Sequence, residues 1–310
     1  MIKISGLEER NLQFEWSAKS KEIASVPLDE FVSLDIPDSS TLQIREDSDV
    51  SVLTKLDPSK YDAAVGPIKV EGVTKGDTLM VEIVKVNTWR WGWTSISPSF
   101  GLLKGRFGDH LIHWDIGLSH AVSRNRFLSG IKIPVRPFLG VVSTLPGKGR
   151  YPMIPPRQFG GNMDNRLLTV GSILYLPVNV DGAMVSFGDP HAAQGDGEVC
   201  GTAIETGAEV TVRFRVIKNQ PVKYPRAMIP AFGEGICVLT TGISRSLRKA
   251  ALIAIEEMID DITRTTGLSE EEAYALCSVA GNLKISEIVD EPNYVVSLTL
   301  PKSLLYHKVI

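Results

Sequence analysis

The sequence predicts an α+β protein that is predominantly β, with a sandwich-like antiparallel β body and a C-terminal helical segment. Two observations predict this fold. Short segments that alternate apolar and polar residues recur through residues 1–243, separated by turns, and the whole chain contains 27 glycines and 18 prolines. Helical periodicity appears only after them. Many short strands with frequent turn residues are typical of β-sandwiches and barrels.

The individual strands follow from this alternation. Residues 209–216 alternate most cleanly, which predicts one buried and one solvent-facing side. The turn at Gly76-Asp77 predicts that 65–73 and 78–86 form a hairpin. Further strands are expected at 167–178, 184–187 and 294–300.

The region from Trp89 to Arg166 is different. It holds four of the five tryptophans and many glycines, but few long periodic segments. We expect long ordered loops here, as at 147–152, and such loops in a compact domain are often functional. The alternative is connecting structure whose aromatic residues only pack.

Two helices are expected between about residues 245 and 281. After Ser244, a possible N-cap, apolar residues recur in steps of three and four until near Gly267. Ser269 and Glu272 then form a capping box for a second helix that ends near Ala280. We expect both helices to cover a sheet, within a single unit that spans residues 1–310.

Composition excludes several classes of function. The net charge is -3 and the basic residues are not clustered, so we expect no nucleic-acid partner. No apolar run approaches about 18 residues, so we expect no membrane span. The first ten residues lack the apolar segment of a signal peptide. Three scattered cysteines without a Cys-x-x-Cys pair favour a reducing, cytoplasmic location.

The block from Asp164 to Glu205 is the strongest candidate site, because it gathers acids, one histidine and several glycines. Asp189 and His191 are two residues apart, so in extended chain they share one face and could hold a metal ion. Asp164 arrives from another strand or loop. A histidine with carboxylates suits zinc, or a harder cation. Glu198 or Asp196 could then transfer a proton. The alternative is plain turn chemistry, in which aspartates favour tight turns.

Other reactive residues carry weaker signals. Cys200 could be a thiolate nucleophile, or a small buried residue. His110, His113 and His120 could form a second metal cluster, or be hydrogen-bonded loop residues. Glu71 is either a turn residue or a group that faces the site. The chain contains no Gly-x-Ser-x-Gly elbow and no phosphate-binding Gly-Lys-Ser/Thr loop.

The chain resembles the acetamidase/formamidase family. The resemblance is carried by Gly161-Asn162-Met163-Asp164, by the run from Gly188 to Glu205, by Gly66-Pro67-Ile68-Lys69-Val70-Glu71-Gly72 and by Thr240-Thr241-Gly242-Ile243-Ser244. The matching motifs follow in the family's order from about residue 57 to 300. Two segments depart from the pattern. Residues 60–65 lack a histidine that many relatives carry, and the Trp89–Trp93 stretch replaces a glycine-rich one.

The resemblance implies hydrolysis of a short aliphatic amide, such as formamide or acetamide, to the carboxylate and ammonia. It also implies a divalent metal, zinc or alternatively calcium, and a homodimer or higher homo-oligomer. Carried over by position, Asp164 and His191 are the first metal ligands and Asp189 the next. Glu198, Asp196 and Glu71 are the candidates for proton transfer or for support of the ligands. Two alternatives stay open: a Cys200 nucleophile, and a non-catalytic β-sandwich that binds a small ligand.

Overall fold

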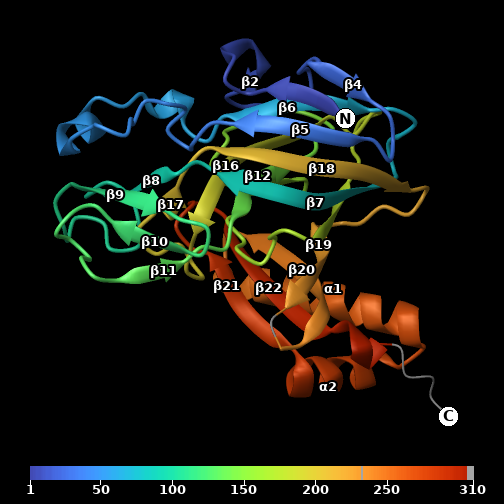
Figure 1. Ribbon diagram of the computed structural model, residues 1–310. Coiled ribbons are helices and arrows are strands. Elements are labelled where there is room, and N and C mark those ends of the chain that lie inside the picture. The colour runs from blue at the N-terminus through green and yellow to red at the C-terminus, as the bar shows by residue number, and fades with distance from the viewer. Residues whose placement is uncertain (232, 306–310) are drawn as a thin grey trace.

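Two large β-sheets dominate the computed structural model, which describes residues 1–231 and 233–305. Figure 1 shows the sheets stacked, with the helices at the opposite end of the molecule from β2 and β4. The first sheet has nine strands in the spatial order β1 (Ile2–Ser5), β5 (Phe31–Ile36), β18 (Ala208–Ile217), β7 (Thr78–Thr88), β15 (Ile173–Pro177), β19 (Arg226–Ala231), β20 (Gly235–Ser244), β22 (Tyr294–Pro301) and β21 (Asn282–Glu287).

The second sheet has eleven strands. Its main path is β11 (Lys132–Pro134), β10 (His120–Ser123), β9 (His110–Ile116), β8 (Trp91–Ile96), β17 (Ile204–Glu205), β16 (Val185–Ala193), β12 (Phe138–Ser143) and β14 (Gly160–Asn162). Off this path, β6 (Ala64–Val70) pairs with β16, β2 (Leu12–Gln13) and β4 (Ala24–Val26). A small sheet joins β3 (Trp16–Ser17) to β13 (Arg150–Tyr151), and short 3-10 helices span Glu9–Asn11, Val50–Thr54, Pro58–Lys60 and Lys302–Leu305.

The two large sheets pack face to face around one apolar core, as a β-sandwich does. Phe187 of β16 and Phe214 of β18 meet across this core with ring centroids 6.1 Å apart. Neighbouring strands are antiparallel except for β1 with β5 and β4 with β6. The predicted fold class is therefore confirmed. The alternation predicted for 209–216 is also observed, with Val210, Val212 and Phe214 buried.

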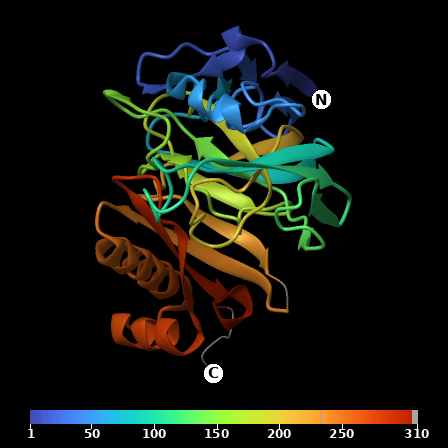
Figure 2. The same ribbon diagram turned by 90° about the vertical axis from the view of Figure 1, so that its left-hand side faces the viewer.

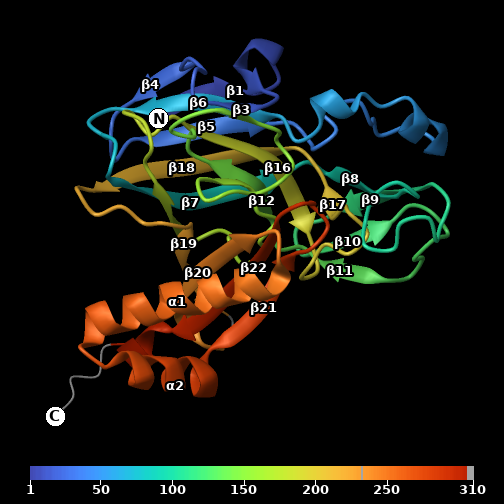
Figure 3. The same cartoon turned by 180° about the vertical axis from the view of Figure 1, so that it is seen from behind.

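Both predicted helices are present and cover the first sheet. Figures 2 and 3 show α1 (Leu247–Thr266) and α2 (Glu270–Ala280) against β20 and β22. Ala250, Ala254 and Met258 pack there on residues of these strands. α1 ends at Gly267, whose φ of 78° is the left-handed C-cap conformation. The capping box of Ser269 and Glu272 is confirmed. No helix of the described residues is both long and apolar enough to cross a membrane.

The predicted cap of α1 is wrong by two residues. Ser244 is the last residue of β20 and pairs with Tyr294. Ser246 is the N-cap, and its side chain accepts a hydrogen bond from the Lys249 N–H. The strand persists past the point at which the apolar pattern changes, so the helix begins later than periodicity alone indicates.

The predicted hairpin between 65–73 and 78–86 is also wrong. β6 pairs in the second sheet, whereas β7 pairs with β15 and β18 in the first. Six of the seven residues of β6 are buried. A strand that is apolar on both faces needs cover on both, which a hairpin edge cannot give. The turn at Gly76-Asp77 therefore carries the chain from one sheet to the other.

Two further expectations need correction. The strand expected at 167–178 begins only at Ile173, after a turn at Gly171 with a φ of 87°. The region 89–166 contains the expected loops, such as 97–109, but it also supplies seven strands, β8 to β14, that were not predicted. Its strands are short and contain buried tryptophans, such as Trp93 and Trp114, so the periodic pattern was too brief to predict them.

The contact between β20 and α1 gives the first testable prediction. A Cβ at Gly242 would collide with the Ala250 carbonyl oxygen, which belongs to a helix backbone that cannot turn aside. Gly242→Ala is expected to lower the free energy of unfolding by about 1–3 kcal/mol, the usual cost of overpacking. Urea unfolding followed by circular dichroism measures this. Gly108→Ala is the control, because a Cβ there meets nothing within 4 Å. Equal stability of the two variants would contradict the close approach.

Candidate functional site

A buried cluster of carboxyl groups surrounds one histidine at the end of β16. The strand places Asp189 and His191 on one face, as the sequence predicts, with His191 Nε2 2.9 Å from an Asp189 carboxylate oxygen. Glu205 on β17 is the direct cross-strand partner of His191, and its carboxylate lies 3.1 Å from the same nitrogen. His191 is 1% exposed and Asp164 is fully buried.

Gln194 fixes the protonation of His191. Its amide nitrogen donates to the Asp164 carbonyl oxygen at 2.6 Å, so its amide oxygen is the atom 2.8 Å from His191 Nδ1. An amide oxygen only accepts, and Nδ1 therefore carries a hydrogen. The other nitrogen, Nε2, is the one that faces the carboxylates. It either bears a second proton or is the nitrogen that would coordinate a cation.

Asp164 and Asp189 converge over a glycine. Asp164 follows β14, and a Cβ at Gly140 of β12 would collide with carboxylate oxygens of both aspartates. Asp164, Asp189 and Glu198 have φ angles of 41°, 52° and 48°. Residues other than glycine seldom adopt this left-handed region, and they cluster at functional sites when they do. Local backbone strain thus accompanies the convergence of the acids.

Further buried acids border the cluster. Asp290 accepts a hydrogen bond from Asn162 at 2.8 Å, and Asp38 accepts one from the Trp93 indole at 2.8 Å. Glu287 accepts from the backbone N–H groups of Val289 and Asp290. Within residues 1–231 and 233–305, no lysine or arginine forms an ion pair with any of these carboxyls or with those of the cluster. The site therefore concentrates negative charge that protons or a cation must balance.

Burial and mutual repulsion shift the pKa values of these groups. Desolvation, and next the charge of Asp189, raise the pKa of Asp164 to about 8. Desolvation, followed by the Asp164 charge, raises the pKa of Glu198 well above its ordinary range. Desolvation opposes the charged form of His191, but Asp189 and Glu205 outweigh it and raise the His191 pKa. Such shifts in a cavity are typical of functional sites.

The donor set fits a divalent cation. Asp164, Asp189 and His191 each offer one atom within 4.8 Å of the others, and so do His191, Glu198 and Glu205. Both carboxylate oxygens of Asp164 and one of Asp189 lack a hydrogen-bond partner among the described residues, although they are buried. Buried oxygens without partners are costly unless a proton or an ion satisfies them. The residues predicted as metal ligands are therefore adjacent and chemically suited to that role.

The cluster opens into a cavity of about 390 Å³. Asp62, Asp189, Glu198, Glu205 and Asp290 line its acidic side. Its apolar and aromatic lining residues are Ile44, Leu53, Leu56, Tyr61, Trp93, Phe100 and Ile154. A cavity that combines apolar walls with polar groups is typical of a small-molecule site.

The structure places two predicted proton-transfer residues away from this cluster. Asp196 is exposed and forms an ion pair with Arg166, with its nearest oxygen 2.6 Å from Nε. Glu71 is exposed beyond the end of β6 and accepts a hydrogen bond from Ser25. Asp196 follows Gly195, and Glu71 begins the turn after β6, so both lie in turn segments at the surface. Of the three predicted candidates, only Glu198 lies beside His191.

The weaker candidates are also separate from the cluster. Cys200 donates from Sγ to the Thr202 carbonyl oxygen at 3.3 Å. His110 stacks on Phe127, and His113 bonds the Ser48 carbonyl oxygen. Neither these two histidines nor His120 belongs to a metal-binding group in the described part of the chain. The three histidines lie on strands β9 and β10 rather than in loops, and Cys200 is only partly buried, so neither structural alternative holds as stated.

Sequence reasoning missed Glu205, Asp62 and Asp290 as site residues. Glu205 lies in the family-like run, but only the pairing of β17 with β16 reveals that it faces His191. Asp62 lies in the segment that lacks the family histidine, and it lines the cavity. Asp290 follows the helices by ten residues. No local pattern connects these three acids.

Comparison with known proteins identifies the family. The Acetamidase/Formamidase family model matches residues 5–151 and 148–307. A formamidase of Methylophilus methylotrophus is 27% identical, over 96% of this chain and 90% of that protein. The crystal structure of a predicted acetamidase/formamidase from Thermoanaerobacter tengcongensis superposes with a TM-score of 0.88, 31% identity and coverage of 98% and 97%. An acetamidase of Bacillus halodurans gives 0.90, 29% and full coverage of both chains.

The raised pKa of Asp164 predicts how stability depends on pH once metal has been removed by a chelator. Between its ordinary value of 3.8 and about 8, the folded state holds a proton that the unfolded state has lost. Stability should therefore fall as the pH rises through this window, by about 1.4 kcal/mol per pH unit for one proton. Asp164→Asn should reduce that slope by about one proton in urea titrations between pH 4 and 8. An unchanged slope would contradict a protonated Asp164.

Proposed function

Because this chain belongs to the acetamidase/formamidase family, we propose that it hydrolyses a short aliphatic amide, of the formamide or acetamide type, to a carboxylate and ammonia. Membership makes it a hydrolase that acts on carbon–nitrogen bonds of linear amides. The observation that carries the proposal is the contact of His191 with Asp189 and Glu205, beside Asp164 and Glu198, next to a cavity lined by several of these acids. The homo-oligomeric state and the cytoplasmic location expected from the sequence remain predictions.

Asp164, Asp189 and His191 Nε2 would hold a divalent cation, with zinc as the first choice and calcium as the alternative. When bound, such a cation supplies Lewis acidity towards the amide carbonyl and the attacking water. The unpartnered oxygens of the two aspartates support this assignment. Gln194 holds the hydrogen on Nδ1 and so keeps Nε2 directed at the carboxylates.

Glu198 is the residue best placed to move the proton. It is buried, lines the cavity and has a pKa raised by desolvation and then by Asp164. A carboxyl with a raised pKa can take a proton from water and return it at neutral pH. Amide nitrogen leaves poorly unless it is protonated, so this return is the step that releases ammonia. Asp62 and Asp290 line the same cavity and could accept hydrogen bonds from the amide nitrogen.

The Cys200 nucleophile gains no support from the geometry. Its thiol bonds a backbone carbonyl rather than a base, and Cys200 is absent from the residues that line the cavity. A thiol nucleophile needs an adjacent base or a lowered pKa. The non-catalytic alternative requires a degraded site, whereas Asp164, His191 and Glu198 are all present and adjacent.

Ammonia release from formamide and acetamide tests the proposal. Glu198→Gln keeps the shape but removes the transferable proton, and it should lower kcat by about 10²–10⁴-fold. Asp196→Asn and Cys200→Ala are matched controls and should keep near-normal turnover. Chelation should abolish turnover and metal addition should restore it. Full activity of metal-free protein would exclude metal assistance. An inactive Cys200→Ala variant would instead support the mechanism in which the Cys200 thiol is the nucleophile.

Gly140→Ala tests the metal-binding geometry without reference to activity. Its methyl group would displace the carboxylates of Asp164 and Asp189, so zinc affinity should fall by at least about 10–100-fold, the range seen when groups around metal ligands are perturbed. Titration calorimetry and elemental analysis of the purified protein measure this. Gly195→Ala, whose added Cβ meets nothing within 4 Å, should bind as wild type does. Equal affinity in both variants would place the metal elsewhere.

A further inference from the structure

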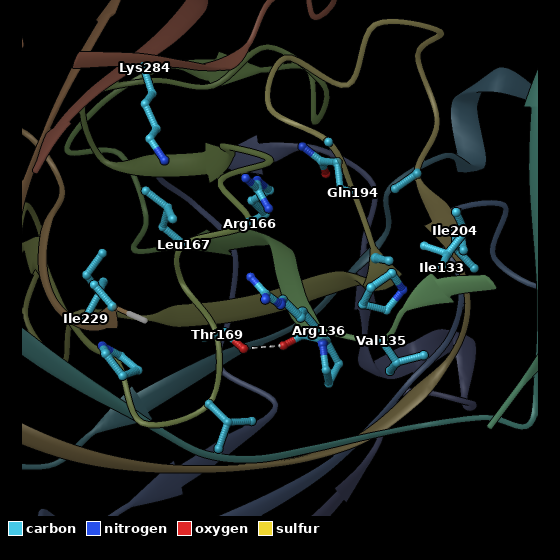
Figure 4. Close-up of a pocket in the computed structure, with 18 of the residues that line it drawn as sticks. Ile133, Val135, Arg136, Arg166, Leu167, Thr169, Gln194, Ile204, Ile229 and Lys284 are labelled. Carbon is cyan, nitrogen blue, oxygen red and sulfur yellow. Dashed lines mark hydrogen bonds between the residues drawn. The ribbon is translucent and has the colours of Figure 1, made fainter. Parts of the chain in front are cut away.

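A second and larger cavity, of about 930 Å³, lies on the other side of Gln194 from the acidic cluster. Strands β11, β17, β19 and β21 all contribute to its walls. Figure 4 shows Ile133, Val135, Leu167, Ile204 and Ile229 around it. The walls are therefore largely apolar, and this space is distinct from the cavity into which Glu198 opens.

Positive charge dominates this second cavity. Arg136, Arg166 and Lys284 line it, whereas Glu234 is the one acidic residue among its described lining residues. Arg166 is neutralised by Asp196, which lies 2.6 Å away. Arg136 and Lys284 have no side-chain hydrogen bond or ion pair with any described residue. Figure 4 shows the charged ends of both directed into the same space. The cavity thus offers two cations without an ion-pair partner among the described residues, Arg136 being exposed and Lys284 half-buried.

Gln194 connects this cavity to the acidic cluster. It lines the cavity, while its amide group bonds His191 Nδ1 and the Asp164 carbonyl oxygen. A molecule in the cavity would therefore lie against the side chain that fixes the hydrogen on His191. Thr202 lines both cavities, so the wall between them is a single layer of chain.

We propose that this second cavity binds a medium-chain carboxylate. We further propose that the bound anion, through its contact with Gln194, changes the hydrogen bond that Gln194 makes to His191. The carboxylate group would be held between Arg136 and Lys284, which supply the charge complementarity. The alkyl chain would cover the walls formed by Ile133, Leu167 and Ile229, because burial of apolar surface favours association. Formate or acetate would leave most of this volume unfilled, so chain length distinguishes this site from the hydrolytic cavity.

The binding test uses the full chain and titration calorimetry with butanoate, hexanoate and octanoate. Affinity should increase by up to about fourfold for each added CH2 that is buried. The double substitution Arg136→Gln with Lys284→Gln should weaken octanoate binding at least tenfold. The matched control, Arg248→Gln with Lys19→Gln, removes two exposed cations elsewhere and should bind as wild type does. Octan-1-ol, which has the chain but no charge, should bind much more weakly. Equal octanoate affinity in the two double variants would overturn the proposal.

A kinetic test locates the bound anion and rests on the proposed amidase function, whereas the binding test does not. At saturating octanoate, kcat for acetamide should change with KM nearly constant, and the effect should disappear in the Arg136→Gln, Lys284→Gln variant. If octanoate only raises KM, it competes in the hydrolytic cavity and the proposal fails. If no amide is hydrolysed at all, the proposed function fails while the calorimetric result still decides whether the second cavity binds carboxylates.

Discussion

The hydrogen bond between Gln194 and His191 is the interaction on which the candidate site depends. It fixes the hydrogen on Nδ1, leaves Nε2 between Asp189 and Glu205, and ties the loop after β16 to the backbone of Asp164. All nine residues of β16 are buried, so this strand cannot shift without opening both faces of the second sheet. The sandwich is thereby a rigid support that holds one imidazole against several carboxylates.

That arrangement costs stability in the absence of a compensating charge. Desolvation raises the pKa values of Asp164, Glu198 and Asp290 together, and each acid also raises the pKa of its neighbours. A histidine alone cannot neutralise so many carboxyls, and the described residues provide no basic partner for them. Bound protons or a bound cation must therefore be part of the folded state. This is the physical reason why metal affinity, pH and stability are expected to be linked in this protein.

Local signals made much of the fold predictable. The capping box of Ser269 and Glu272, the apolar stripe of α1 and the alternation in β18 each depend on residues close in sequence, and each is observed. The predictions were wrong where the position of a strand depends on the distant segment with which it pairs. The sequence predicts β6 as half of a hairpin, and only its burial on both faces, which the structure shows, excludes that pairing. Asp189 and His191 were predictable because both lie on one strand, whereas Glu205 needed the register of β17 against β16. Asp62 and Asp290 needed the complete fold.

Backbone conformation shows why the site differs from the rest of the sandwich. Asp164, Asp189 and Glu198 each adopt positive φ, which costs a non-glycine residue about 1–2 kcal/mol. Glycine would relieve that strain at each position but would remove the carboxyl, and Gly140 shows that the fold does place glycine where a side chain would collide with the acids. Strain and buried charge at the same three residues both oppose stability. The surrounding strands hold the three acids in these unfavourable conformations. Strain and buried charge at the same residues indicate that the acids are retained for binding or catalysis.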